Sequence, residues 1–227
     1  MSAALTIEIW SDVMCPWCII GYRNLVRGLE LLDGEIEAEI SWLPFELNPD
    51  MPAEGEEQGA HIARKYGRTP EQAAEAGAMM AGRARVAGFP FDYTGEGGPP
   101  PKTMWNTFAA HKLLRWTLAA HGPEAQTRLK LALFAAHFQQ RRRIGERDVL
   151  LDIAEEAGLD RGEAQAALDD PALTETVRRE ERQAWDANIT GVPAMVVDGK
   201  FLIPGAQEPE TYADVLRKIV ARRAAQA

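Results

Sequence analysis

Apolar and polar residues alternate over 5–10, a pattern that predicts a short strand. From Pro16 the apolar spacing becomes helical, and proline is favoured in the first turn of a helix because it has no N–H group to leave unpaired. The helical spacing continues to a turn at Asp33 and Gly34, after which residues 36–43 alternate again. The start of the chain therefore predicts a β-α-β unit.

The middle of the chain has helical spacing and a high alanine content, which favours helix. Residues 50–58 predict a loop, and a run rich in glycine and proline breaks the pattern over 95–101. Six helices are predicted, over 59–66, 70–86, 102–121, 123–140, 146–157 and 160–168. We therefore expect an all-helical block here.

The end of the chain returns to mixed structure. Residues 172–187 and 211–222 predict helices, and between them two short apolar runs flank Asp198 and Gly199. An Asp-Gly pair between such runs is a strong local signal for a β-hairpin. The order β-α-β, helical block, α-β-β-α predicts an α/β fold interrupted by a helical insertion, with parts over 1–48, 49–170 and 171–227.

The composition narrows the possible partners. The chain has 25 Lys and Arg against 34 Asp and Glu, a formal net charge of −9. A surface this acidic repels a phosphate backbone, so we expect no nucleic-acid partner. The apolar run over 129–138 contains Lys130 and His137 and is far shorter than the ~20 residues of a membrane span. The N-terminus lacks the basic start and apolar run of a signal peptide, so we expect no membrane attachment and a cytoplasmic protein.

The strongest candidate chemistry is the sequence Cys15-Pro16-Trp17-Cys18, which contains the only two cysteines of the chain. It lies at the predicted strand-to-helix turn, where unpaired N–H groups and the positive end of the helix dipole stabilise an anion. We therefore expect a lowered pKa at Cys15, which attacks a disulfide as a thiolate. Cys18, one turn deeper, would resolve the mixed disulfide. Burial of both sulfurs away from solvent would argue against these roles.

Three other interpretations of the cysteine pair are weaker. A zinc site needs about four ligands, and the histidines are dispersed without metal-ligand spacing, so no metal is predicted; they are His61, His111, His121 and His137. A purely structural disulfide would close a very small loop and so remove little unfolded-state entropy. Inert thiols are the third alternative. A redox-active dithiol inside a β-α turn is the favoured interpretation.

Several motifs together resemble the thioredoxin superfamily in its DsbA-like branch. More narrowly, the chain resembles FrnE-type thiol oxidoreductases, which are relatives of the 2-hydroxychromene-2-carboxylate isomerases. The resemblance spans nearly the whole chain and is carried by residues 11–21, 44–49, 106–111, 191–193 and 205–207.

The resemblance implies a thioredoxin fold with an all-helical insertion and a thiol–disulfide oxidoreductase with Cys15 and Cys18 as its catalytic pair. The substrate would be a protein or small molecule with a thiol or disulfide, glutathione among them, and no cofactor is implied beyond the redox-active disulfide. It also implies a cis peptide bond between Val192 and Pro193 beside the cysteines, where the Val192 backbone would pair with an extended substrate.

Pro16 and Trp17 lie between the two cysteines and are expected to tune them. Strongly oxidising DsbA proteins carry a histidine at the position of Trp17. Tryptophan adds no charge, so we expect a less acidic Cys15 and a less oxidising disulfide than in that branch.

Two other functions stay open. The isomerase relatives depend on glutathione and generally carry a serine where this chain has Cys15, a departure that counts against an isomerase. A chaperone-like binding module could use the helical block and the Val192 edge, with the cysteines only modulating it.

The other candidate residues are weaker. Asp12 precedes the cysteine pair, and capping of the helix is a better interpretation than proton transfer. Asn106 and His111 are expected to be satisfied polar groups of the core. Four tryptophans are expected in the core: Trp42, Trp105, Trp116 and Trp185.

Overall fold

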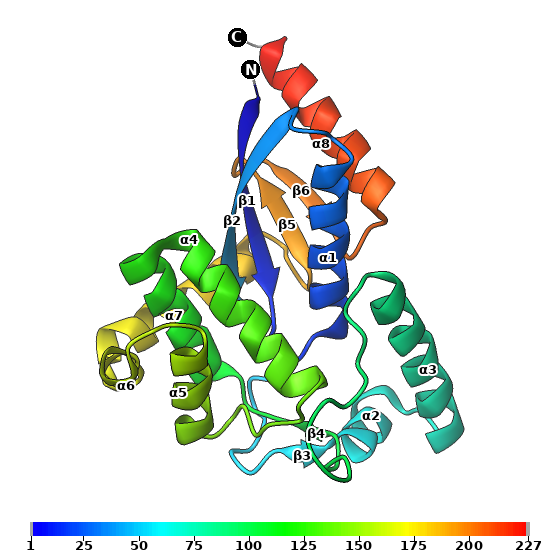
Figure 1. The fold of residues 1–227 in the computed structure, drawn as a ribbon, viewed down its shortest axis with the longest axis vertical. Coiled ribbons are helices and arrows are strands. Elements are labelled where there is room, and N and C mark those ends of the chain that lie inside the picture. The colour runs from blue at the N-terminus through cyan, green and yellow to red at the C-terminus, as the bar shows by residue number, and fades with distance from the viewer. Residues whose placement is uncertain (1, 226–227) are drawn as a thin grey trace.

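A four-stranded sheet forms the centre of the computed structural model, which describes residues 2–225. Its strands are β1 (Ala3–Ser11), β2 (Ile36–Pro44), β5 (Ala194–Val197) and β6 (Phe201–Pro204), in the order β2-β1-β5-β6. Strand β1 pairs in parallel with β2 and antiparallel with β5, and β5 and β6 form the predicted hairpin (Figure 1). Asp198 and Gly199 in its turn have φ of 50° and 63°, the left-handed values that a tight hairpin turn requires.

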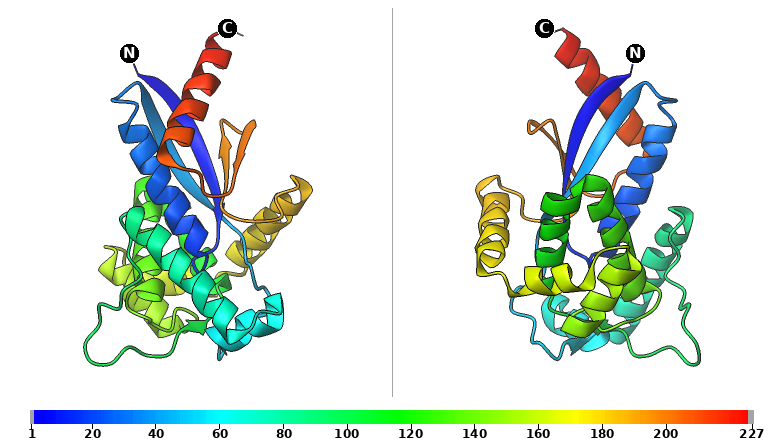
Figure 2. Two further views of the ribbon diagram at one scale, coloured as in Figure 1. Left: turned by 90° about the vertical axis from the view of Figure 1, so that its right-hand side faces the viewer. Right: turned by 60° about the vertical axis from the view of Figure 1, so that its left-hand side comes forward.

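Two long helices pack together on one face of this sheet. Helix α1 (Pro16–Glu30) and helix α8 (Pro209–Ala224) lie side by side in all views (Figures 1 and 2). Gly28 permits this approach, since a Cβ there would lie 2.8 Å from the carbonyl oxygen of Pro209. With helix α7 (Pro171–Asp186), these elements confirm the predicted β-α-β and α-β-β-α segments.

The helical segment between β2 and α7 packs mainly around one long helix. Helix α4 (Phe108–Phe138) bends at Gly122, where φ is 82°, and contacts β2 and helices α5 (Arg147–Glu156), α6 (Arg161–Asp169) and α7. Helices α2 (Gln58–Tyr66) and α3 (Pro70–Val86) form a separate pair beside the start of α1 (Figure 1). The start of α1 therefore lies between two helical groups.

The predicted helix over 102–121 begins too early. Residues Thr103–Met104 instead form strand β4, which pairs with β3 (Glu56–Glu57) in the predicted loop. Helix α4 begins only at Phe108, whose amide donates to the Asn106 side chain at 3.0 Å. The three-part division stays a prediction, and its outermost residues, 1 and 226–227, lie outside the described part of the chain.

Two of the four tryptophans predicted in the core are buried. Trp42 and Trp105 are buried, and Trp116 is half-buried. Trp185 is 58% exposed because it lies near the end of α7 and only one face packs, with its ring centroid 5.6 Å from that of Phe45.

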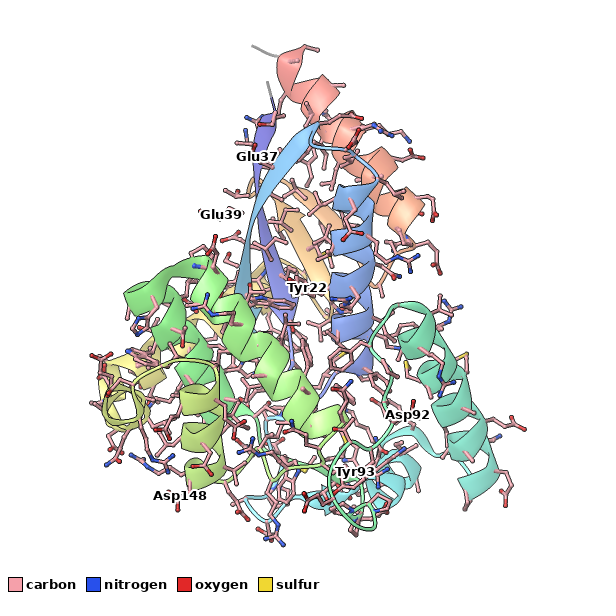
Figure 3. All side chains as sticks on the ribbon, viewed as in Figure 1. Tyr22, Glu37, Glu39, Asp92, Tyr93 and Asp148 are labelled. Carbon is pink, nitrogen blue, oxygen red and sulfur yellow. The ribbon has the colours of Figure 1, made fainter. Side chains whose placement is uncertain are left out.

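The core beneath α1 also joins the sheet to α4. The Tyr22 side chain extends from α1 toward α4 in Figure 3, and its ring centroid lies 5.0 Å from that of Trp42 on β2. Phe134 of α4 continues this contact, at 6.1 Å from Trp42. Among the described residues, no helix is long and apolar enough to cross a membrane.

Candidate active site

The two cysteines lie on the first turn of α1. Cys15 is the N-cap residue, with extended backbone angles, and Pro16 occupies the first helical turn. The Cys15 amide donates to the Asp12 carbonyl at 3.2 Å, and the Cys18 amide donates to the Cys15 carbonyl at 3.1 Å. Both side chains are free thiols in this structure. The β-α turn therefore places two reduced sulfurs next to each other, as the spacing predicted.

The structure contradicts the lowered pKa expected at Cys15. A hydrogen bond with the Cys18 side chain, burial and the negative charge of Asp12 raise the pKa of Cys15 well above its usual value. The helix end is therefore outweighed by the partner sulfur and the apolar surroundings. The expectation that Cys15 is less acidic than in DsbA proteins with a histidine at the Trp17 position stays a prediction.

Both sulfurs are buried, which is the outcome that we stated would argue against the expected roles. Cys18 is 0% exposed, as predicted for the deeper sulfur, but Cys15 is only 3% exposed. Trp17 and Val192 pack against the core cluster that contains the pair. A substrate disulfide therefore reaches Cys15 only after the groups over it move.

The segment at Val192 and Pro193 lies against the first cysteine. The peptide bond between them is cis, which confirms the prediction. The Cys15 thiol donates to the Val192 carbonyl at 3.6 Å. Gly21 leaves room for this segment, since a Cβ at Gly21 would lie 3.1 Å from Pro193 Cγ. The two parts of the predicted site, far apart in sequence, therefore meet.

Trp17 lies between α1 and α3. It is half-buried, and it packs against a small cluster that includes Ile20 and Ala84. The guanidinium of Arg83 lies 5.6 Å from the centre of its ring. Helix α3 thus packs against Trp17, which lies between the two cysteines in the sequence.

Asp12 does not cap α1, contrary to our expectation. Its buried carboxylate accepts from the amide of Met14 at 3.3 Å and from that of Leu47 at 2.8 Å. Burial alone would raise the pKa of Asp12, but His111, the Leu47 amide and the positive charge of Lys130 keep it below its usual value. Asp12 therefore stays ionised and ties the cysteine turn to the end of β2.

Asn106 and His111 differ in whether their polar side-chain atoms have hydrogen-bond partners. Asn106 donates to the Met51 carbonyl at 3.3 Å, in addition to its contact with Phe108. His111 is 2% exposed, and its Nε2 atom lies 3.7 Å from Asp12 Oδ1 without a hydrogen bond of normal length. The expectation of a satisfied core group holds for Asn106 and is wrong for His111.

Lys130 of α4 is the residue that the sequence reasoning missed. It is 0% exposed, and its Nζ atom lies 3.5 Å from the Ser11 carbonyl oxygen at the end of β1. The rings of Trp42 and Phe134 surround it, with centroids 5.2 and 5.1 Å from Nζ. The sequence did contain a signal for this residue, because Lys130 interrupts the apolar run over 129–138.

The fold and the site together define a class of protein. The sequence profile of the DsbA-like thioredoxin domain matches residues 6–217, so the chain belongs to this family of DsbA-like thiol oxidoreductases and has the thioredoxin fold. The chain is 28% identical to a probable DsbA oxidoreductase from Streptomyces coelicolor, with a TM-score of 0.83 over 94% of this chain and 89% of that one.

Two more distant structures share the fold. One is a 2-hydroxychromene-2-carboxylate isomerase, 14% identical, with a TM-score of 0.67 over 98% of this chain and 99% of the isomerase. The other is the cytosolic disulfide reductase DsbM from Pseudomonas aeruginosa with glutathione, 17% identical, with a TM-score of 0.61 over 95% and 99% of the two chains. At these identities the likeness concerns the fold alone.

Proposed function

We propose that this protein exchanges disulfides with protein or small-molecule thiols through Cys15 and Cys18. The observation that carries the proposal is a pair of free thiols three positions apart at the start of α1, with Cys15 donating to the Val192 carbonyl beside a cis proline. Family membership supports redox chemistry on thiols or disulfides. Glutathione is a candidate substrate because DsbM, which shares the fold, was solved with it.

The reaction takes two balanced steps. The Cys15 thiolate attacks one sulfur of the substrate disulfide, forms a mixed disulfide and expels the other substrate sulfur as a thiolate. The Cys18 thiolate then attacks the sulfur of Cys15, which forms the intramolecular disulfide and releases the second substrate thiolate. Two electrons pass to the substrate, and the reverse sequence oxidises a substrate dithiol. The potential of the compartment sets the net direction.

The contact between Cys15 and Val192 couples attack to substrate binding. In this structure the Cys15 thiol donates a hydrogen bond to the Val192 carbonyl, which is then not available to a substrate. Formation of the attacking thiolate removes this donor, so the carbonyl becomes free to accept from the backbone of an extended substrate. Pro193 directs its own carbonyl to the Gly205 amide at 2.8 Å, which leaves Val192 as the substrate-facing group of this segment.

A cytoplasmic setting is part of the proposal. The chain has two cysteines, both at the reactive turn, as suits a compartment where structural disulfides are rare. DsbM, with the same fold, is described as cytosolic.

Insulin reduction with glutathione as reductant tests the function. We expect Cys15→Ser to abolish turnover, because serine cannot form the mixed disulfide. We expect Cys18→Ser to accumulate a Cys15 mixed disulfide with glutathione, visible by mass spectrometry. Full turnover by Cys15→Ser would refute the proposal.

The same variants address the two other functions. Turnover of a chromene carboxylate with glutathione that survives in Cys18→Ser would favour an isomerase. Suppression of aggregation that survives loss of both cysteines would favour a binding module.

A further inference from the structure

Lys130 occupies an unusual place for a charged side chain. An ammonium group without an ionic partner is costly to bury. Within residues 2–225, no carboxylate lies within ion-pair distance of Lys130, and its one hydrogen-bond acceptor is the Ser11 carbonyl at 3.5 Å. The faces of Trp42 and Phe134 supply weak cation–π stabilisation. The resting contacts of Lys130 therefore do not account for its burial.

Besides the ionised Asp12, which is not within ion-pair distance of Lys130, the cysteine pair is the other negative charge that can complete this environment. Lys130 and both cysteines belong to one region: Phe134, one turn along α4 from Lys130, shares a core cluster with Cys15 and Cys18. Ser11, the acceptor of Lys130, ends the strand that leads into the cysteine turn. Reduction of the disulfide by two electrons and one proton yields one thiol and one thiolate, so a negative charge forms in this enclosed region.

We propose that the Lys130 ammonium, supplied by α4 of the helical segment, is the counter-charge for the thiolate of the Cys15–Cys18 pair. Lys130 is thus a positioning residue for disulfide exchange, acting on the sulfurs by charge and not by contact. The inference rests on the proposed function and assigns the helical segment a direct part in it.

The electrostatics agree with this arrangement. Burial lowers the pKa of Lys130 to about 8, and the negative charges of Cys18, Asp12 and Cys15 oppose this lowering. The ammonium form is therefore favoured when a thiolate is present and disfavoured when the sulfurs are joined in a disulfide. Lys130 and the dithiol should titrate as a linked pair.

Other ionisable groups face the same region and must be included in any pH profile. Asp12 stays ionised and opposes a thiolate at Cys15. Burial lowers the pKa of His137 to about 4 and raises that of Tyr212 to about 12, so both are neutral near pH 7. Three further groups are His111 beside Asp12, Arg83 of α3 over the ring of Trp17, and Tyr22 against Trp42, whose pKa burial raises. Lys130 is thus the cation enclosed with the sulfurs.

The first test titrates the thiolate of the reduced protein by its ultraviolet absorbance. We expect Lys130→Met to move the thiolate transition up by about one pH unit, a tenfold loss of thiolate at a given pH. Resolution of a Cys15–glutathione mixed disulfide should slow by about threefold at neutral pH, because the higher nucleophilicity of a more basic thiolate offsets only part of the tenfold loss of thiolate. At alkaline pH, where both proteins are fully ionised, the slowing should disappear and the variant should react faster. Superimposable titrations would overturn the inference.

Lys112 supplies a matched control on the same helix. It is also buried, but its Nζ atom donates to the carbonyls of Leu168 at 2.7 Å and Asp170 at 3.0 Å, away from the cysteines. We expect Lys112→Met to lower the free energy of unfolding and leave the thiolate titration unchanged. Lys130→Met should not lower it, since an ammonium group without an ion-pair partner is costly to bury and an apolar group of similar volume removes that cost. An equal shift of the titration in both variants would overturn the inference.

A second measurement uses the unmodified protein. Side-chain NMR should show Lys130 keeping its ammonium form to higher pH in the reduced protein than in the disulfide form. Equal titration in the two forms would overturn the role of Lys130 even if exchange is normal. Failure of the wild-type dithiol to react with glutathione disulfide would overturn the proposed function as well, so the two failures are distinguishable.

Discussion

Two buried carboxyl groups follow neighbouring strands of the sheet, and their pKa values move in opposite directions. Asp12 comes directly after β1 and is 0% exposed, whereas Glu46 comes two residues after β2 and is 7% exposed. The pKa of Asp12 is lowered, while that of Glu46 is raised to about 8. Because both groups are buried, burial alone does not determine the direction of the shift.

The partners account for the difference. Asp12 accepts from two backbone amides and faces the imidazole of His111 and the ammonium of Lys130. Each of these interactions favours the anion. Asp12 is therefore held as a carboxylate beside the cysteine pair.

Glu46 shares its partner with a second carboxylate. Both Glu46 and Glu181 bind Arg178, and each has one buried oxygen without a hydrogen-bond partner. Burial and the charge of Glu181 raise the pKa of Glu46 more than Arg178 lowers it. The comparison teaches that the number of hydrogen-bond donors available to each buried carboxyl group decides whether it is ionised or protonated near neutral pH.

Removal of the Asp12 charge should have the largest effect on stability. We expect Asp12→Asn to lower the free energy of unfolding by about 3 kcal/mol, because an amide retains only one acceptor oxygen for two amide donors. In the wild type this contribution is present above the unfolded-state pKa of Asp12 and is lost as pH falls through the lower folded-state value. Urea unfolding from neutral to acidic pH measures both effects.

The same variant should alter the cysteine pair. The charge of Asp12 raises the pKa of Cys15, so Asp12→Asn should bring that pKa down and speed alkylation of Cys15 at neutral pH. An unchanged free energy of unfolding would contradict the view that the donors around Asp12 require its negative charge.

Glu46→Gln should have the next largest effect, with the opposite dependence on pH. The pKa of Glu46 is about 8 in the folded protein against 4.5 normally, so the folded state binds the extra proton between these values. The contribution of Glu46 to stability should therefore be full below pH 4.5 and be lost as pH rises toward 8. Glutamine mimics the protonated form and should remove this fall, so the variant should be more stable than the wild type at alkaline pH.

Glu181→Gln is the matched variant for this cluster. Removal of the neighbouring charge should move the pKa of Glu46 back toward its usual value and reduce the fall in stability without abolishing it. Urea unfolding at several pH values compares the three proteins. Parallel curves for the wild type and Glu46→Gln would show that Glu46 carries no extra proton.

The elements and the cysteine site were predictable because their signals are local. Alternation, helical spacing and an Asp-Gly turn suffice for the sheet strands and the hairpin, and the spacing of Cys15 and Cys18 is sufficient to place both on one helical turn. The cis bond before Pro193 was expected from the family resemblance and is confirmed. The identity of the reactive turn thus follows from short stretches of sequence.

The electrostatics of the site depend on residues far apart in the chain. Leu47 binds the carboxylate of Asp12 across 35 positions, and Lys130 reaches Ser11 across 119. No local pattern shows that α4 carries its lysine to the end of β1. The helix end suggested an acidic Cys15, but the hydrogen bond with the Cys18 side chain and burial raise its pKa instead.

A carboxylate on the surface should give the smallest effect, because the comparison of Asp12 with Glu46 applies only to buried groups. Glu35 forms a two-pronged ion pair with Arg217 at 2.7 and 3.0 Å, and this pair lowers the pKa of Glu35. Its side chain is 51% exposed, so water and salt screen the interaction and replace it when it is lost. We expect Glu35→Gln to leave the urea midpoint unchanged within measurement error at physiological salt. A loss as large as that of Asp12→Asn would mean that the donors around a carboxylate stabilise the fold as strongly in solvent as in the interior.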